Sequence, residues 1–256
     1  MGTPTYPVGI KRIQGETLAL TTTLASLGFP ANYHQALLYS PSADFRMHIN
    51  PALLGAYFYD ASAAQGSRFV NLLSNLTDRD TSTGSGTSMN AMQTGDFIYL
   101  AFPEPVGGVR FTVGNANAVA STPTAAFSAG GSTWTSLTIS TDGTSSGGAT
   151  FAVTGSMVWT TPTTWQNTNL AVALGLLDID NVPSFNAHWL RIAVSAAQTN
   201  PTSITEVWSL NRDTSRGYFR LGQEYMLSLD RRLEGAFEAV LAAGTSTLEV
   251  TWVRTA

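Results

Sequence analysis

TDGTSSGGATFAVTGSMVWTTPTTW, residues 141–165, is the most strongly patterned stretch of this 256-residue chain. Its glycines and Asp142 favour tight turns, while its threonines and valines favour β-strands. The stretch contains one carboxylate and no His, Cys, Lys or Arg. We therefore predict that it builds β-structure and a surface, and that it holds no reaction centre.

Short strand-like runs continue on both sides of this stretch, and turn residues separate them. They occupy residues 36–40, 45–49, 53–60, 96–102, 108–113, 124–129, 133–139, 149–155, 156–161, 188–195 and 203–210. AGGS, between two of them, is typical of a hairpin turn. Many short strands at this spacing indicate a sandwich or a barrel, and we predict an all-β protein built on an antiparallel, jelly-roll-like β-sandwich.

One run, HWLRIAVS (188–195), shows how such a strand divides its side chains. Because successive residues point to opposite faces, Leu190 and Ile192 share one face, together with Val194. We expect that face to lie in the core. Trp189 and Arg191 share the other face, which we expect to be a partly covered surface.

The two ends of the chain are also strand-like. We assign residues 61–210 to a central Gly/Ser/Thr-rich sandwich, and residues 1–60 and 211–256 to terminal β segments. Residues 15–29 and 246–256 carry little charge, and uncovered strand edges of this kind promote aggregation. We expect the ends to cover each other as a second β unit, or to reach neighbouring subunits as arms.

The helical signal is thin. Residues 67–76 have apolar side chains at helical spacing and predict one or two helical turns. Residues 231–244 fit either a helix ending before Gly244 or a strand that forms a hairpin with the next run. Gly235 favours the hairpin.

The composition argues against several classes of function. Charged residues make up 12% of the chain, and the formal net charge is −4. A nucleic-acid-binding protein would need clustered basic residues. The chain has no cysteine, no apolar run long enough to span a membrane, and no apolar leader in its first residues.

No arrangement of reactive residues predicts catalysis, a cofactor or a metal. The three histidines, His34, His48 and His188, lie far apart in the sequence and match no metal-binding motif. Two carboxylate pairs, Asp78/Asp80 and Asp178/Asp180, have a spacing that calcium ligands can adopt. Aspartates in loops more often bind their own backbone, and we favour that interpretation.

The tryptophans have two interpretations. On a β scaffold they could form a flat platform on which sugars stack; the candidates are Trp134, Trp159, Trp165, Trp189 and Trp208. They could instead anchor the core or subunit contacts. Few polar residues adjoin them to bind sugar hydroxyls, so we favour packing.

The order of motifs from about residue 60 to residue 210 resembles a β module of tailed-bacteriophage virion structural proteins. A GVRF strand is followed by a G-S-x-W hairpin, a DGT–GG turn, a TGSMVW strand, a P-x-x-W corner and a WLRI strand. The residues that carry the resemblance are Trp134, Asp142, Gly143, Thr144, Trp159, Pro162, Trp165, Trp189 and Arg191. An insertion, residues 167–188, precedes the WLRI strand.

The resemblance implies a structural module with no catalytic residues to transfer. We therefore expect a non-enzymatic capsid decoration (cement) protein on the outer surface of the virion, made in the host cytoplasm. Its partners would be the major capsid protein and copies of itself, for example in a trimer, with no nucleic acid and no membrane. The alternative is a tail, baseplate or fibre-associated protein whose aromatic face binds a host glycan.

Overall fold

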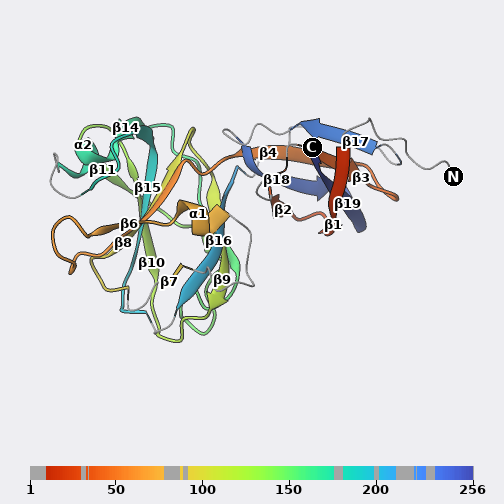
Figure 1. Ribbon diagram of the computed structural model, residues 1–256. Coiled ribbons are helices and arrows are strands. Elements are labelled where there is room, and N and C mark those ends of the chain that lie inside the picture. Colours follow the sequence, from red (N-terminus) through yellow and green to blue (C-terminus); the bar gives the residue numbers. More distant parts are fainter. Residues whose placement is uncertain are drawn as a thin grey trace. The chain divides into compact units, whose positions relative to one another are not determined.

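The computed structural model describes residues 10–29, 33, 35–77, 87–88, 92–175, 181–198, 202–211, 222, 224–228 and 234–255. The chain divides into two compact units (Figure 1). We call residues 51–210 the central unit, and residues 1–50 together with 211–256 the terminal unit. The boundary lies at Pro51 rather than at residue 61, because β5 (Gly55–Tyr59) pairs along its length with β8 (Phe97–Phe102).

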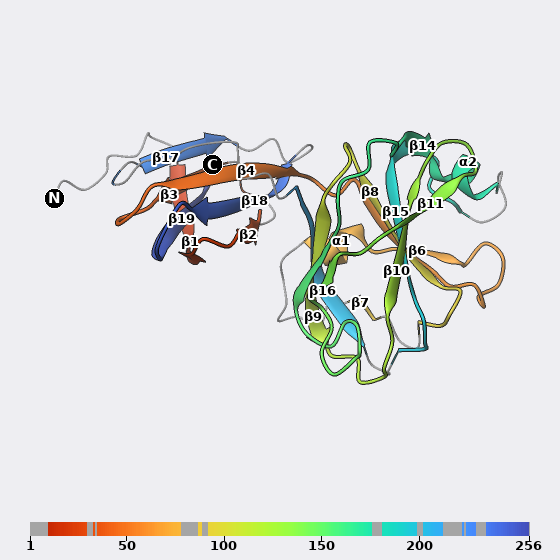
Figure 2. The ribbon, with the colours of Figure 1, turned by 180° about the vertical axis from the view of Figure 1, so that it is seen from behind.

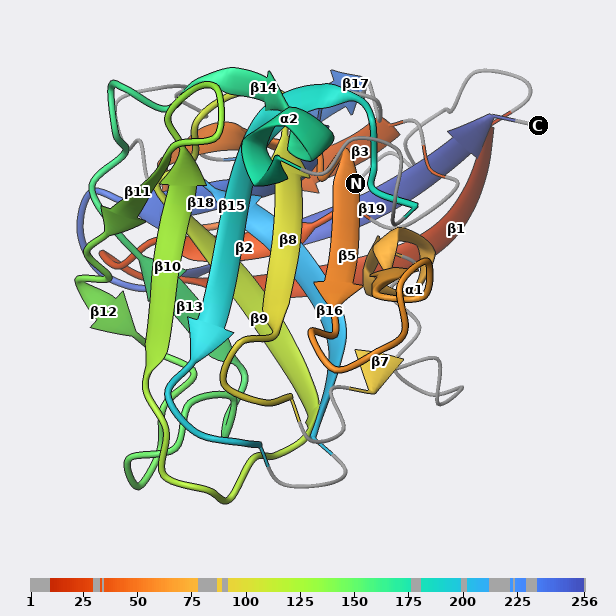
Figure 3. The same cartoon turned by 90° about the vertical axis from the view of Figure 1, so that its left-hand side faces the viewer.

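In its described residues the central unit contains two antiparallel sheets. The seven-stranded sheet (Figure 3) has the order β11 (Trp134–Leu137), β10 (Pro123–Ser128), β15 (Asn186–Val194), β8, β5 and β6 (Phe69–Asn71), and β14 (Asn167–Asn169) also pairs with β15. The five-stranded sheet has the order β12 (Thr141–Asp142), β13 (Gly155–Val158), β9 (Gly108–Asn115), β16 (Ser203–Leu210) and β7 (Thr87–Ser88). Figure 2 shows β9 and β16 side by side.

The main hydrophobic core lies between these two sheets. Leu190, Ile192 and Val194 of β15 contribute to it from the seven-stranded sheet, as the alternation within that strand predicts. Phe111 of β9 and Met157 of β13 contribute from the five-stranded sheet and are fully buried. The predicted all-β antiparallel sandwich is therefore confirmed.

Two short helices lie between strands in the described part of the central unit. The first, α1 (Leu73–Thr77), lies at the end of the segment predicted to contain helical turns, and its Leu76 enters the core. The second, α2 (Leu170–Leu174), begins at Asn169, whose side chain accepts a hydrogen bond from the Ala171 amide at 2.9 Å. No helix in the described residues is long and apolar enough to cross a membrane.

The terminal unit is a second, smaller sandwich. One sheet has the order β1 (Ile10–Leu20), β19 (Ser246–Thr255), β3 (Gln35–Tyr39) and β17 (Glu224–Ser228). The other has the order β2 (Ala25–Gly28), β18 (Glu234–Leu241) and β4 (Phe45–Pro51). Trp252 is fully buried between them and meets the Phe29 ring edge-on, with centroids 5.8 Å apart. The two ends of the chain thus cover each other: β1 and β19 pair antiparallel, with Leu18 opposite Leu248.

Two local predictions were wrong. Residues 149–154 form turns instead of a strand, because the Ala152 and Val153 amides both bond to the Thr144 carbonyl. The expected hairpin after residue 231 does not form, although both of its strands exist. β18 and β19 belong to different sheets, so the connection between them carries the chain across the core. The side chains of β18 from Ala236 to Leu241 are all buried, so both faces of this strand are covered.

We predict that residues 51–210 fold when they are expressed alone. The core of the central unit lies within this range, and its two ends are joined because the Ser209 hydroxyl donates to the Pro51 carbonyl at 2.6 Å. Far-ultraviolet circular dichroism should show a β spectrum and a single cooperative thermal transition. A broad transition without cooperativity would show that the central unit depends on the terminal one.

Candidate functional site

The turn formed by Asp142, Gly143 and Thr144 fixes one corner of the central unit. The Asp142 carboxylate accepts hydrogen bonds from the Thr144 amide at 3.0 Å and from its hydroxyl at 2.6 Å. The Thr144 hydroxyl is fully buried; it lies 3.0 Å from the Thr150 hydroxyl and accepts from the Phe151 amide at 3.1 Å. Asp142 therefore closes its own turn.

Gly143 and Gly155 allow the two strands at this corner to approach closely. The Gly143 amide donates to the Ser156 carbonyl at 2.8 Å. A Cβ atom on Gly155 would overlap the Gly143 carbonyl, and one on Gly143 would lie 3.0 Å from the Ser156 carbonyl oxygen. Any larger residue at position 155 would force this corner apart.

The tryptophan platform, which was the less favoured interpretation of the sequence, does not form. Trp159 and Trp165 are each 4% exposed in the core, and the Trp159 indole donates to a backbone carbonyl at 2.7 Å. Pro162, in the corner between them, is half-buried. Trp189 is fully buried on the opposite face of its sheet. Three of the five candidate tryptophans are thus inaccessible to a sugar.

The outer face of the seven-stranded sheet, which points away from the core, carries the remaining side chains of interest. Trp189 lies here beneath Phe185, with ring centroids 5.0 Å apart, and its indole donates to the Thr168 carbonyl at 2.9 Å. Trp134, on edge strand β11, is half-buried and donates to the Ala173 carbonyl of α2 at 2.9 Å. A second hydrophobic cluster therefore covers part of this face.

Arg191 is held between two aromatic rings of this cluster. Its guanidinium carbon lies 4.6 Å from the centroid of the Trp134 ring and 5.2 Å from that of Phe97, both within cation–π range. Tyr99 lies opposite Arg191 in the strand register and is 1% exposed. Burial raises the pKa of the Tyr99 hydroxyl, and the charge and hydrogen bond of Arg191 only partly oppose that shift. Tyr99 thus remains neutral at physiological pH.

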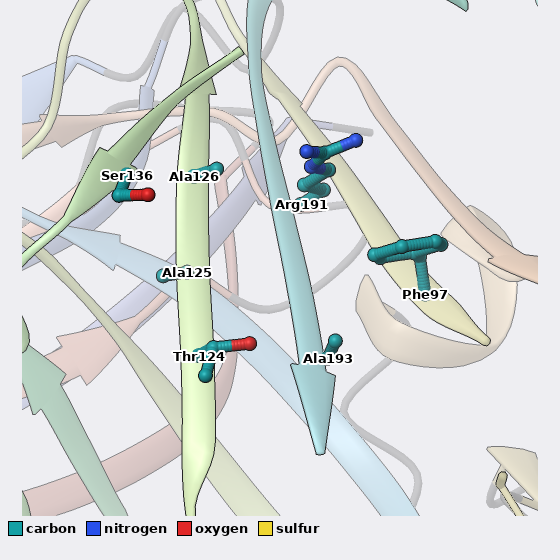
Figure 4. A pocket seen from close by; sticks show the side chains of 7 residues that line it. All are labelled: Phe97, Thr124, Ala125, Ala126, Ser136, Arg191 and Ala193. Atoms are coloured by element: carbon teal, nitrogen blue, oxygen red, sulfur yellow. The ribbon is translucent and has the colours of Figure 1, made fainter. Parts of the chain in front are cut away.

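A hollow of about 140 Å³ opens beside Arg191 (Figure 4). It is lined by Phe97, Thr124, Ala125, Ala126, Ser136, Arg191 and Ala193. The strand register places Ser136, Ala126 and Arg191 side by side, with Thr124 beside Ala193 in the next row. The small alanine side chains leave the space free, so the hollow has hydroxyl groups on one side and a guanidinium on the other.

The sequence analysis placed Trp134 and Arg191 among the important residues, but it missed Phe97, Thr124 and Ser136. Alternation within residues 96–102 could have placed Phe97 and Tyr99 on one face. The sequence does not predict, however, that β8 and β10 are the two neighbours of β15 in the sheet. The hollow depends on that pairing.

The sequence analysis also considered the histidines and two carboxylate pairs as possible metal ligands. In the described residues, no group of three or more His, Asp or Glu side chains is arranged to hold a metal ion. His48 is buried in the terminal unit, whereas His188 lies in the central unit, where its Nδ1 is 3.0 Å from the Pro103 carbonyl oxygen. His34 and both predicted carboxylate pairs, Asp78/Asp80 and Asp178/Asp180, lie outside the described residues.

Comparisons with known proteins add little. No protein-family model and no curated protein matches the chain. Among solved structures, the arabinofuranosyltransferase AftD from mycobacteria aligns with a TM-score of 0.30 and 13% sequence identity. The alignment covers 92% of this chain but 20% of that protein's chain. A similarity this weak carries no argument about fold or function.

We predict that Thr144→Val lowers the free energy of unfolding of the central unit by about 1–3 kcal/mol. The substitution keeps the shape but leaves the Phe151 amide without its acceptor in a buried site. Thr135→Val, on an exposed position of β11, is the matched control and should change stability by less than about 0.5 kcal/mol. Denaturant unfolding measures both. Equal effects would show that the buried hydroxyl does not stabilise the turn.

We also predict that the central unit loses stability in mild acid through His188. Burial lowers the pKa of this imidazole below its ordinary value of 6.5, and the hydrogen bonds and the Glu104 charge oppose that shift. The unfolded state therefore binds the proton more readily, so protonation favours unfolding. The stability that the neutral His188 imidazole contributes is lost as the pH falls from about 6.5 through the folded-state pKa. His188→Gln should flatten this part of the stability profile. An unchanged profile would contradict the assignment.

Proposed function

We propose that this chain is a non-enzymatic structural protein of a tailed-bacteriophage particle, and specifically a capsid decoration (cement) protein. It would bind the outside of the head and stabilise it through contacts with the major capsid protein and with copies of itself. The ordered series of motifs between residues 60 and 210 motivates the proposal. The way the fold uses those motifs supports it.

The motif residues serve the fold of the central unit. Thr144 and Asp142 close a corner, Trp159 and Trp165 fill the core, and Trp189 packs beneath Phe185. These side chains hold a rigid sandwich in place. A decoration protein needs such a scaffold, because its task is to present a fixed surface to a capsid.

The observation that carries the proposal is the outer face of the seven-stranded sheet. It combines a half-buried arginine, aromatic rings and small side chains around a shallow hollow. Arginine and aromatic residues are enriched where proteins contact one another, while lysine is depleted. The whole chain contains a single lysine, Lys11, so it has few of the mobile side chains whose ordering weakens an interface.

A tail, baseplate or fibre location is the second candidate. A host glycan would have to bind here through the hydroxyl groups of Thr124 and Ser136, because Arg191 covers the neighbouring aromatic rings. The two locations differ in where the protein sits on a particle. Immunogold labelling of intact virions distinguishes them, because gold on the tail would exclude the decoration role.

We predict that particles lacking this protein lose resistance to heat and to osmotic shock. Added subunit contacts stabilise only the assembled shell, so their loss lowers the temperature at which heads release DNA. Adding the purified protein back should restore that temperature. Unchanged particle stability after removal would contradict the cement role.

A further inference from the structure

We propose that the hollow beside Arg191 is a carboxylate-binding site that takes an aspartate or glutamate side chain of a partner protein. The partner's acidic side chain would pair with the Arg191 guanidinium and meet the hydroxyl groups of Thr124 and Ser136. In its choice of a protein partner, this inference rests on the proposed function. The carboxylate chemistry itself rests on the geometry of the site.

Arg191 is already ordered for such a contact. The Trp134 and Phe97 rings hold the guanidinium at 4.6 Å and 5.2 Å, so little side-chain freedom remains to be lost on binding. The two rings flank the guanidinium and one of its hydrogen bonds goes to Tyr99, which leaves its other N–H groups as the hydrogen-bonding edge. A carboxylate matches that edge with two parallel hydrogen bonds.

The five-stranded sheet shows a similar arrangement with its carboxylate present. Arg110 lies 5.7 Å from the centroid of the Trp208 ring, and the charge of Glu206 acts on it. Glu206 is 7% exposed and also accepts from the Thr112 hydroxyl at 2.9 Å. Around Arg191 the aromatic ring and the hydroxyl groups recur, but no carboxylate within the described part of the chain pairs with it. The hollow lies beside Arg191 instead.

The same geometry argues against a sugar as the occupant. Sugars stack on open aromatic faces, and here Arg191 covers faces of both Trp134 and Phe97. The Phe97 ring is further enclosed by Tyr59 and Tyr99, at centroid distances of 6.1 Å and 5.7 Å. The hollow therefore offers a charge and hydroxyl groups, without a free platform.

The first experiment measures binding of a defined probe to the full-length protein. A capped glycine-glutamate-glycine tripeptide is titrated while the Arg191 Nε–H and Trp134 Nε1–H signals are followed by NMR. We expect saturable shifts at both signals, and binding at least about tenfold weaker for the glutamine analogue, which lacks the charge. Absence of binding, or equal binding of both peptides, would overturn the proposal. Tighter binding of glucuronate than of the tripeptide would overturn it in favour of an acidic glycan.

Three variants test whether the hollow is the site. Arg191→Lys keeps the charge but loses the planar edge, and Ala126→Met fills the hollow without removing the arginine. Each should weaken binding of the glutamate peptide at least about tenfold. Arg46→Gln, at an exposed position of β4 in the terminal unit, removes one positive charge elsewhere and should leave binding unchanged. Retained binding by a folded Ala126→Met protein would show that the peptide binds elsewhere.

Binding of the same variants to undecorated heads separates this inference from the proposed function. If the wild type binds heads and both Arg191→Lys and Ala126→Met bind several-fold more weakly, the site is the contact. If all three bind equally, the protein decorates heads but the hollow is not its contact, and the inference fails. If the wild type binds the glutamate peptide but not heads, the carboxylate site stands and the capsid proposal fails.

Discussion

Strand β15 is hydrogen-bonded on both sides, to β8 and to β10, and this double pairing sets the two faces of the central unit. Because side chains alternate along a strand, fixing Leu190 and Ile192 in the core forces Arg191 onto the outer face. A register slip by one residue would place a guanidinium in the core and a leucine in solvent. The alternation within β15 therefore specifies the sandwich and the surface together.

The outer face would expose a broad apolar surface if nothing covered it. Helix α2 and Phe185 cover the end around Trp189, and the aromatic rings around Tyr99 cover one another. Arg191 completes this cover, because its charged guanidinium stays hydrated while it lies on the rings. The cover ends where the side chains are small, at Ala126 and Ala193, and the hollow begins there.

Local pattern predicted the fold class but not which strands pair. The alternation of core and outer side chains along β15 and the AGGS turn between β10 and β11 both follow from residues adjacent in the sequence. Both predictions are confirmed. Residues 149–154 were predicted as strand because β propensity ignores the buried Thr144 hydroxyl and carbonyl, which bind their backbone. The hairpin prediction for β18 and β19 failed because a short connection can also cross between sheets. The site was only partly predictable, since it brings together segments far apart in sequence.

Stacking on aromatic rings explains why arginine is the cation on these two surfaces. A lysine ammonium is more strongly hydrated and more mobile, so it lies on aromatic rings less often than a guanidinium does. Arginine tolerates partial burial because its planar group stacks and keeps its hydrogen-bonding edge open. Both sheets of the central unit use this property, with Arg110 on Trp208 and Arg191 on Trp134 and Phe97. The difference between them is a carboxylate: Glu206 acts on Arg110, whereas the open hollow lies beside Arg191.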